Sequence, residues 1–154
     1  MRTRTILASL AVLFAGVALC LAADLQMGTW KLNEAKSKLA AGMAKNTTVV
    51  YEAAGDNIKV TVDGVDKDGK PAHNEWTGKF DGKDYPVTGD PASDMRSYKM
   101  VNEHTMSIVV KKGGKVTLTG RVVVAADGKS RTLTANGTDS SGKPITSIAV
   151  YDKQ

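Results

Sequence analysis

Two segments of the chain have the residue spacing of a phosphate-binding loop. GVDKDGKP (64–71) and GTDSSGKP (137–144) both fit the pattern Gly-x4-Gly-Lys. A nucleotide-binding loop needs Ser or Thr next, to bind a metal, and then a helix whose N-terminus faces the phosphates. Pro71 and Pro144 occupy that place, so both segments predict tight turns between strands. Their similarity indicates the same hairpin turn in each half of the chain.

The side chains that could bind a metal do not form a recognisable site. His73 and Glu75 lie two residues apart on one face of a predicted strand, but nothing in the sequence brings His104 close to them. The acidic stretch 66–75 has part of the spacing of a calcium loop, yet its first position is Gly64, which has no side-chain oxygen. We therefore expect no metal and no cofactor.

The sequence also has no recognisable catalytic motif and no cluster of nucleic-acid-binding residues. No serine lies in a Gly-x-Ser-x-Gly elbow, and most acidic residues fall in predicted turns. The basic residues are spread along the chain rather than clustered with stacking aromatics. The sequence therefore favours neither an enzyme nor a nucleic-acid-binding protein.

The N-terminus has the pattern of a secretory signal peptide. Arg2 and Arg4 precede an uncharged apolar run over residues 6–22, and small residues follow it. We expect a signal peptide over 1–22, with cleavage after Ala22 or Ala23, and an exported protein that is periplasmic or secreted. The alternatives are a retained anchor, for which the run is short, and a lipid-modified Cys20.

The mature chain, residues 23–154, has the size of one domain. It has no cysteine, so a hydrophobic core rather than a disulfide must stabilise it. Without Arg2 and Arg4, 19 basic residues face 16 acidic ones, a net charge of +3. We expect no stable membrane span after cleavage.

Regular turns divide the mature chain into short alternating segments. Asp-Gly and Gly-Gly pairs recur before lysines, and such pairs tolerate the positive φ of tight hairpins. Between them, apolar and polar residues alternate with period two, which predicts antiparallel strands. The predicted strands are 27–33, 47–53, 57–65, 72–80, 84–88, 96–101, 105–112, 115–125, 131–138 and 145–152.

These strands predict an all-β fold, an up-and-down antiparallel β-barrel of 8–10 strands. Closure removes the exposed edges of so long a meander, and a two-sheet β-sandwich is the alternative. The alternation predicts that Val116, Leu118, Val122 and Val124 share one face. Residues 34–44 form the one predicted helix, of one or two turns at one end of the barrel.

Gly28 and Trp30 in the stretch MGTWKLN (27–33) resemble the first-strand signature of the calycin group, the lipocalins and fatty-acid-binding proteins. The wider chain also resembles uncharacterised secreted bacterial lipocalin-like proteins. The resemblance implies that Trp30 closes one end of the barrel under an arginine, for which Arg121 and Arg131 are the candidates. Fatty-acid-binding proteins hold a carboxylate with arginines on their closing strands, and the last predicted strand here has none.

The inward faces predict an internal cavity. Most inward residues are small or medium-sized, and such side chains do not fill a barrel of eight or more strands. Trp30, Trp76 and Phe80 are the large apolar groups expected to line or plug it, and we predict a small hydrophobic ligand there. The alternative function is a non-catalytic envelope or secreted protein that acts through its outer surface or loops.

Overall fold

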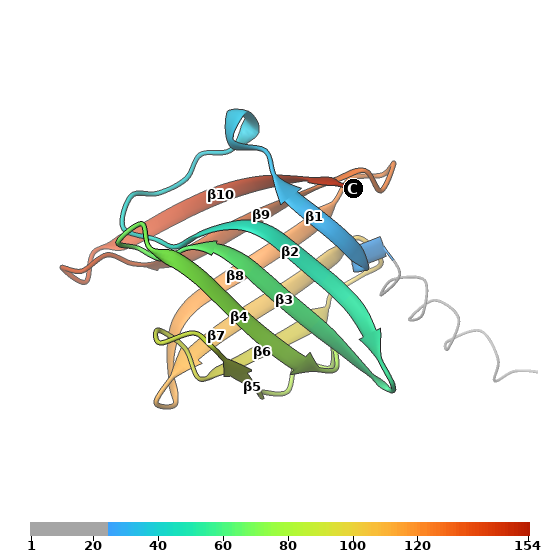
Figure 1. Ribbon diagram of the computed structural model, residues 1–154, viewed down its shortest axis with the longest axis horizontal. Helices are drawn as coiled ribbons and strands as arrows, with labels where there is room; N and C mark the ends of the chain where they lie inside the picture. The colour runs from blue at the N-terminus through green and yellow to red at the C-terminus, as the bar shows by residue number, and fades with distance from the viewer. Residues whose placement is uncertain (1–24) are drawn as a thin grey trace, which may run out of the picture.

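The computed structural model of the chain describes residues 25–154 and contains ten β-strands around one central axis (Figure 1). The predicted signal peptide over 1–22, with its cleavage after Ala22 or Ala23, lies outside the described residues. Within them, no helix is long and apolar enough to cross a bilayer. The strands are β1 (Gly28–Leu32), β2 (Lys45–Ala54), β3 (Asn57–Val65), β4 (Pro71–Gly78), β5 (Tyr85–Thr88), β6 (Met95–Met100), β7 (Thr105–Lys112), β8 (Lys115–Val124), β9 (Ser130–Thr138) and β10 (Pro144–Lys153).

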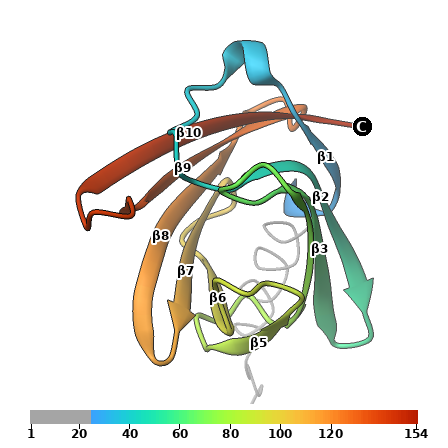
Figure 2. The same cartoon turned by 60° about the vertical axis from the view of Figure 1, so that its left-hand side comes forward.

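The strands form a closed ring in which each is hydrogen-bonded to the next along the chain. The ring closes where β1 pairs with β10, with Trp30 opposite Lys153. Figure 2 shows the two side walls, β2 and β3 on one side and β7 and β8 on the other. All pairs are antiparallel, so the predicted up-and-down barrel is confirmed, and a two-sheet sandwich is excluded because no sheet edge remains.

The helix predicted over residues 34–44 is much shorter in the structure. Only Glu34–Lys36 (η1) form a single 3-10 turn, which the side chain of Asn33 caps. Lys38 then forms an antiparallel bridge with Ile148 on β10. The segment cannot continue as a helix, because its backbone is used to extend the sheet beside β10.

The two Gly-Lys segments form the same turn, as the sequence predicts. Asp66 Oδ1 accepts hydrogen bonds from the backbone N–H groups of Asp68 and Lys70, at 2.8 and 2.9 Å. Asp139 Oδ1 accepts from Ser141 and Lys143 in the same pattern, at 2.9 and 3.0 Å. Each aspartate therefore fixes a hairpin turn, between β3 and β4 in one case and between β9 and β10 in the other.

The prediction that Val116 shares a face with Leu118, Val122 and Val124 is wrong. Val110 pairs with Leu118, but Lys111 pairs with Val116, so Thr117 is an extra residue in β8. A bulge of this kind changes which side chains face inward. Val116 is consequently 56% exposed, whereas Val122 and Val124 are buried on the inner face.

Candidate ligand-binding cavity

The barrel encloses a cavity of about 460 Å³, which residues 42–46, 66–68 and 89–93 line at one end. Its wall is largely apolar and includes Val49, Val62, Ile108, Val122, Leu133 and Ala149. Valine, leucine and alanine side chains leave the axis of a ten-stranded barrel unfilled. The volume lies in the range of small-molecule pockets, about 300–1,000 Å³.

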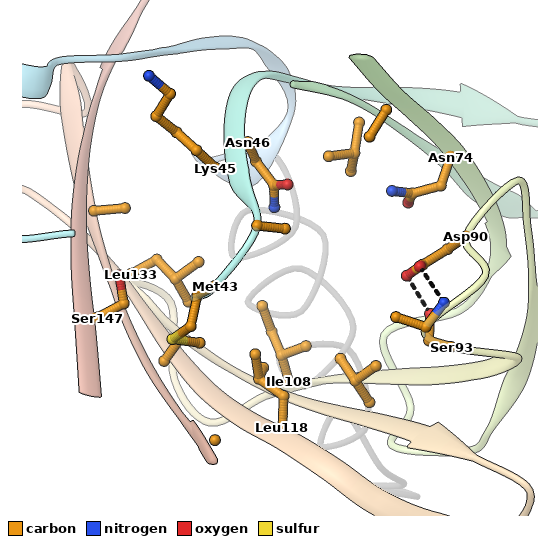
Figure 3. A pocket seen from close by; sticks show the side chains of 18 of the residues that line it. Met43, Lys45, Asn46, Asn74, Asp90, Ser93, Ile108, Leu118, Leu133 and Ser147 are labelled. Atoms are coloured by element: carbon orange, nitrogen blue, oxygen red, sulfur yellow. Dashed lines mark hydrogen bonds between the residues drawn. The ribbon is translucent and has the colours of Figure 1, made fainter. Parts of the chain in front are cut away.

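The mouth of the cavity is lined by both polar and apolar side chains. Met43 and Asn46 lie on one side, and Asn74, Asp90 and Ser93 lie opposite (Figure 3). The mouth segment, residues 39–44, and the residues just before it are attached to β10 through two serines. Ser147 Oγ accepts a hydrogen bond from the N–H of Ala40 at 3.1 Å. Ser37 Oγ accepts one from the N–H of Val150 at 2.9 Å.

Trp30 lies at the opposite, closed end of the barrel and has no exposed surface. Its indole Nε1 donates a hydrogen bond to the carbonyl of Gln26 at 2.8 Å. The guanidinium carbon of Arg131 lies 4.7 Å from the centre of its ring, and Lys153 Nζ lies 5.1 Å from it. Gly28 has a φ of +101°, a conformation that requires glycine at the start of this strand.

Trp76 belongs to a second aromatic cluster in the core. Its ring packs edge-on against Tyr98, with centroids 4.7 Å apart, and stacks with Phe80 at 6.4 Å. Its Nε1 donates to the carbonyl of Arg96 at 2.8 Å. Gly78 leaves room for this cluster, because a Cβ there would come within 2.7 Å of Trp76 Cζ2.

The structure places the three predicted ligand residues next to the cavity wall rather than in it. Trp30, Trp76 and Phe80 are not among the residues that line the cavity. They pack instead against residues that do: Trp30 against Arg131, and Trp76 and Phe80 against Tyr98. Their direct contact with a ligand stays a prediction.

Arg131 is the arginine that covers Trp30, and Arg121 is exposed on the outer face of β8. Arg131 is only 3% exposed, and it also lies over the rings of Tyr51 and Tyr151, at 4.9 and 5.1 Å. A desolvated cation over an aromatic face is stabilised by about 2 kcal/mol or more. The three rings therefore hold the guanidinium in place at the cavity wall.

Arg96 provides a second buried guanidinium on the cavity wall, at 8% exposure. Its Nη1 donates to the hydroxyl of Tyr98 at 3.3 Å, and its Nη2 donates to Asn74 Oδ1 at 3.2 Å. Asp90 Oδ2 lies 3.8 Å from Nη2. Arg96 is not among the residues predicted from the sequence, although its alternation with Tyr98 along β6 places both side chains on one face.

Burial dominates the acid–base behaviour of the cavity tyrosines. It raises the pKa of Tyr98 to about 12, despite the opposing effect of Arg96 and Arg131. It also raises the pKa of Tyr151 to about 12, again against Arg131. Both phenols are therefore neutral hydrogen-bonding groups at physiological pH.

The two histidines do not line the cavity, and they contact different residues. His73 Nδ1 is 2.7 Å from Asp63 Oδ1 on the outer surface, and Glu75 lies 3.7 Å from its Nε2. Hydrogen bonding to Asp63 raises the pKa of His73. His104 instead contacts the carbonyl of Val124. Across residues 25–154, no three His, Cys, Asp or Glu side chains are grouped as metal ligands.

Comparisons with known proteins give similarity at the level of folded shape only. No protein-family model and no curated protein matches the sequence. The structure described as EF1p2_mFAP2b bound to DFHBI is 12% identical, with a TM-score of 0.49 over 86% of this chain and 97% of that one. A redesigned β-barrel, mFAP1, bound to DFHBI, is 13% identical, with a TM-score of 0.47 over 86% and 98%. The resemblance of Gly28 and Trp30 to the lipocalin signature stays a prediction.

Proposed function

We propose that the protein is an exported binding protein that holds a small apolar molecule inside its barrel. The observation that carries the proposal is the cavity of about 460 Å³ with its largely apolar wall. Transfer of an apolar molecule from water into such a cavity is favourable, by roughly 25 cal/mol for each Å² of apolar surface buried. The closed ring of strands provides a continuous wall around a bound molecule.

A neutral fluorescent probe tests this proposal. N-phenyl-1-naphthylamine fluoresces weakly in water and brightly in apolar surroundings, so its titration with the mature chain should give saturable enhancement. Ala135 lines the cavity and is buried, so Ala135→Phe should fill part of it and weaken binding. Val123 lies on the same barrel with its side chain exposed, so Val123→Phe is the matched control and should leave binding unchanged.

The absence of saturable probe binding by the wild type would contradict the ligand-binding function. It would favour the alternative in which the outer surface or the loops act on a partner. Equal loss of binding in Ala135→Phe and Val123→Phe would show that the probe does not occupy the cavity.

Export is the second part of the proposal, and the N-terminal sequence supports it. Arg2 and Arg4 followed by the uncharged run to Ala22 are typical of a signal peptide. Mass spectrometry of the protein from the periplasm or medium should find Ala23 or Asp24 as the first residue. A full-length product that remains in the cytoplasm would contradict export.

A further inference from the structure

The turn between β3 and β4 carries a reactive pair of residues at the mouth of the cavity (Figure 1). We propose that Asp68–Gly69 is a site of spontaneous modification, at which Asp68 converts to isoaspartate through a cyclic succinimide. Glycine favours this reaction in the preceding aspartate, because it has no side chain to obstruct ring closure. The inference goes beyond the proposed function and does not depend on a molecule bound in the cavity.

The reaction needs only the aspartate, the next peptide nitrogen and water. The backbone nitrogen of Gly69 attacks Cγ of the protonated Asp68 carboxyl, so that a C–N bond forms. The carboxyl hydroxyl and the amide hydrogen leave together as water. A water molecule then opens the ring. Attack at Cγ restores aspartate, whereas attack at the backbone carbonyl leaves the chain linked through the side chain, as isoaspartate.

Four Asp-Gly pairs occur in the sequence, and the structure restrains three of them. A carboxylate must leave its hydrogen bonds and turn toward the next peptide nitrogen before it can react. Asp81 is held at both oxygens, because its Oδ1 accepts from the N–H of Lys83 at 2.9 Å and its Oδ2 accepts from the hydroxyl of Tyr85 at 2.8 Å. Asp127 Oδ1 accepts a hydrogen bond from the N–H of Lys129 at 2.9 Å.

The third restrained pair lies inside a strand. Asp63 Oδ1 is 2.7 Å from His73 Nδ1, and the glycine after it pairs with both β2 and β4. Asn136, which also precedes a glycine and could react by the same route with loss of ammonia, is held in the same way. Its Oδ1 accepts from the hydroxyl of Thr146 at 2.8 Å, and it pairs with both β8 and β10. The ladder fixes the backbone at both positions, so neither side chain can close a ring without local opening of the sheet.

Asp68 has no comparable restraint. Within residues 25–154 its carboxylate accepts hydrogen bonds from Lys67 Nζ alone, at 3.1 and 3.2 Å, and both side chains are exposed. An exposed ion pair of this kind contributes little, so the carboxylate leaves it readily. The N–H of Gly69 donates at 3.1 Å, against 2.9 Å for Gly82 and Gly128, so the attacking nitrogen is also the most weakly held of the three turn glycines.

Isomerisation would change the wall of the mouth. Isoaspartate adds one carbon to the backbone between the nitrogens of residues 68 and 69. The N–H groups of Asp68 and Lys70, on either side of this insertion, both donate to Asp66 Oδ1. The lengthened backbone cannot keep both bonds in their present geometry. The modification therefore loosens a turn that lines the cavity.

The turn between β9 and β10 provides a matched control within the same chain. Ser141 and Gly142 occupy the places of Asp68 and Gly69, and the two glycines have φ values of +83° and +80°. Serine has no carboxyl group and cannot form the ring. Asp68→Ser therefore introduces the residue that the equivalent turn already carries, and it should fold normally.

The test follows isoaspartate at each Asp-Gly pair in the mature wild-type chain, kept folded at physiological temperature and neutral pH for several weeks. Peptide mapping with electron-transfer fragmentation distinguishes isoaspartate from aspartate and assigns the position. We expect isoaspartate at residue 68 to accumulate severalfold faster than at residues 63, 81 and 127. The same chain unfolded in guanidinium chloride should react at similar rates at all four pairs, because the structural restraints are then lost.

Variants test the mechanism. Asp68→Asn should react faster than the wild type, since an amide forms the same succinimide by loss of ammonia more readily than a carboxylate does by loss of water. Asp68→Ser should give no isoaspartate in this turn. Equal rates at the four pairs of the folded protein, or faster reaction at Asp63, Asp81 or Asp127, would overturn the assignment. So would an Asp68 that stays unmodified in the folded protein while it reacts in the unfolded chain.

Discussion

The guanidinium carbon of Arg131 lies 4.7 Å from the centre of the Trp30 ring, at the closed end of the barrel. Both side chains are almost completely buried, Trp30 at 0% and Arg131 at 3% exposure. Trp30 belongs to the packed end of the barrel, and Arg131 lines the cavity. The pair therefore connects the stability of the fold with the chemistry of the site.

Replacement of Trp30 should destabilise the fold strongly. Trp30→Ala removes a fully buried aromatic and should lower the free energy of unfolding by about 3–5 kcal/mol. Urea denaturation followed by circular dichroism measures the change. Val123→Ala, at an exposed position of β8, is the control and should change stability by no more than about 0.5 kcal/mol. An unchanged melting temperature in Trp30→Ala would remove the basis of the Gly28–Trp30 signature.

A methyl group at Gly78 should disturb the aromatic cluster. A Cβ there would come within 2.5 Å of Tyr85 Cγ, and both Tyr85 and Trp76 are held by packing. Gly78→Ala should therefore cost about 1–3 kcal/mol by overpacking. Gly137→Ala is the matched strand control, because its nearest contact would be 3.4 Å from Thr117 O. Comparable stability of the two variants would contradict the tight packing around Trp76.

Stability should fall at high pH because burial favours the neutral form of Tyr98 and Tyr151. Tyr98 and Tyr151 ionise near 12 in the folded state, against about 10 in the unfolded chain. The folded state therefore retains protons that the unfolded state loses. The contribution of these groups is fully present below pH about 10 and is lost as pH rises toward about 12, roughly 3 kcal/mol for each tyrosine.

Ultraviolet titration of phenolate absorbance measures these pKa values directly. In the folded protein, Tyr98 and Tyr151 should ionise at least one pH unit later than the same residues in urea. Tyr98→Phe should remove one late-ionising group. A single transition near pH 10 for every tyrosine would contradict the burial of Tyr98 and Tyr151.

The serine contacts of the mouth segment should slow ligand exchange. Ser147→Ala removes the acceptor for the N–H of Ala40 and weakens the attachment of residues 39–44 to β10. A hydrogen bond contributes about 1 kcal/mol, so stopped-flow release of a bound dye should become about fivefold faster. Ser107→Ala, which removes a hydroxyl from the outer face of β7, should leave the release rate unchanged.

Much of the barrel follows from local pattern, and the departures have local causes. Alternation and turn residues predict every strand to within two residues, because both depend on neighbours in the chain. The face of Val116 could not be predicted, since the bulge at Thr117 depends on pairing with β7. The helix over 34–44 was favoured by composition, but its backbone pairs with a strand more than 100 residues away, at Ile148.

The choice between Arg121 and Arg131 was available from the same alternation. Arg131 alternates with Leu133 and Ala135, which line the cavity, so it lies on the inner face of its strand. Arg121 precedes the buried Val122 by one residue, so it lies on the outer face. The position of Arg131 over three aromatic rings was not available from sequence. It depends on which side chains of β1, β2 and β10 meet around one guanidinium.

The short strand β5 has a consequence for the motion of the barrel. It has only two paired positions with β4 and two with β6, whereas β9 and β10 have nine. Opening a ring of strands requires one seam to separate, and the free energy of local opening is lowest where the fewest hydrogen bonds must break. The amide protons of Tyr85, Val87 and Thr88 should therefore exchange with deuterium fastest among the strands. Transient widening of the barrel wall would begin there, beside the ring of Trp76.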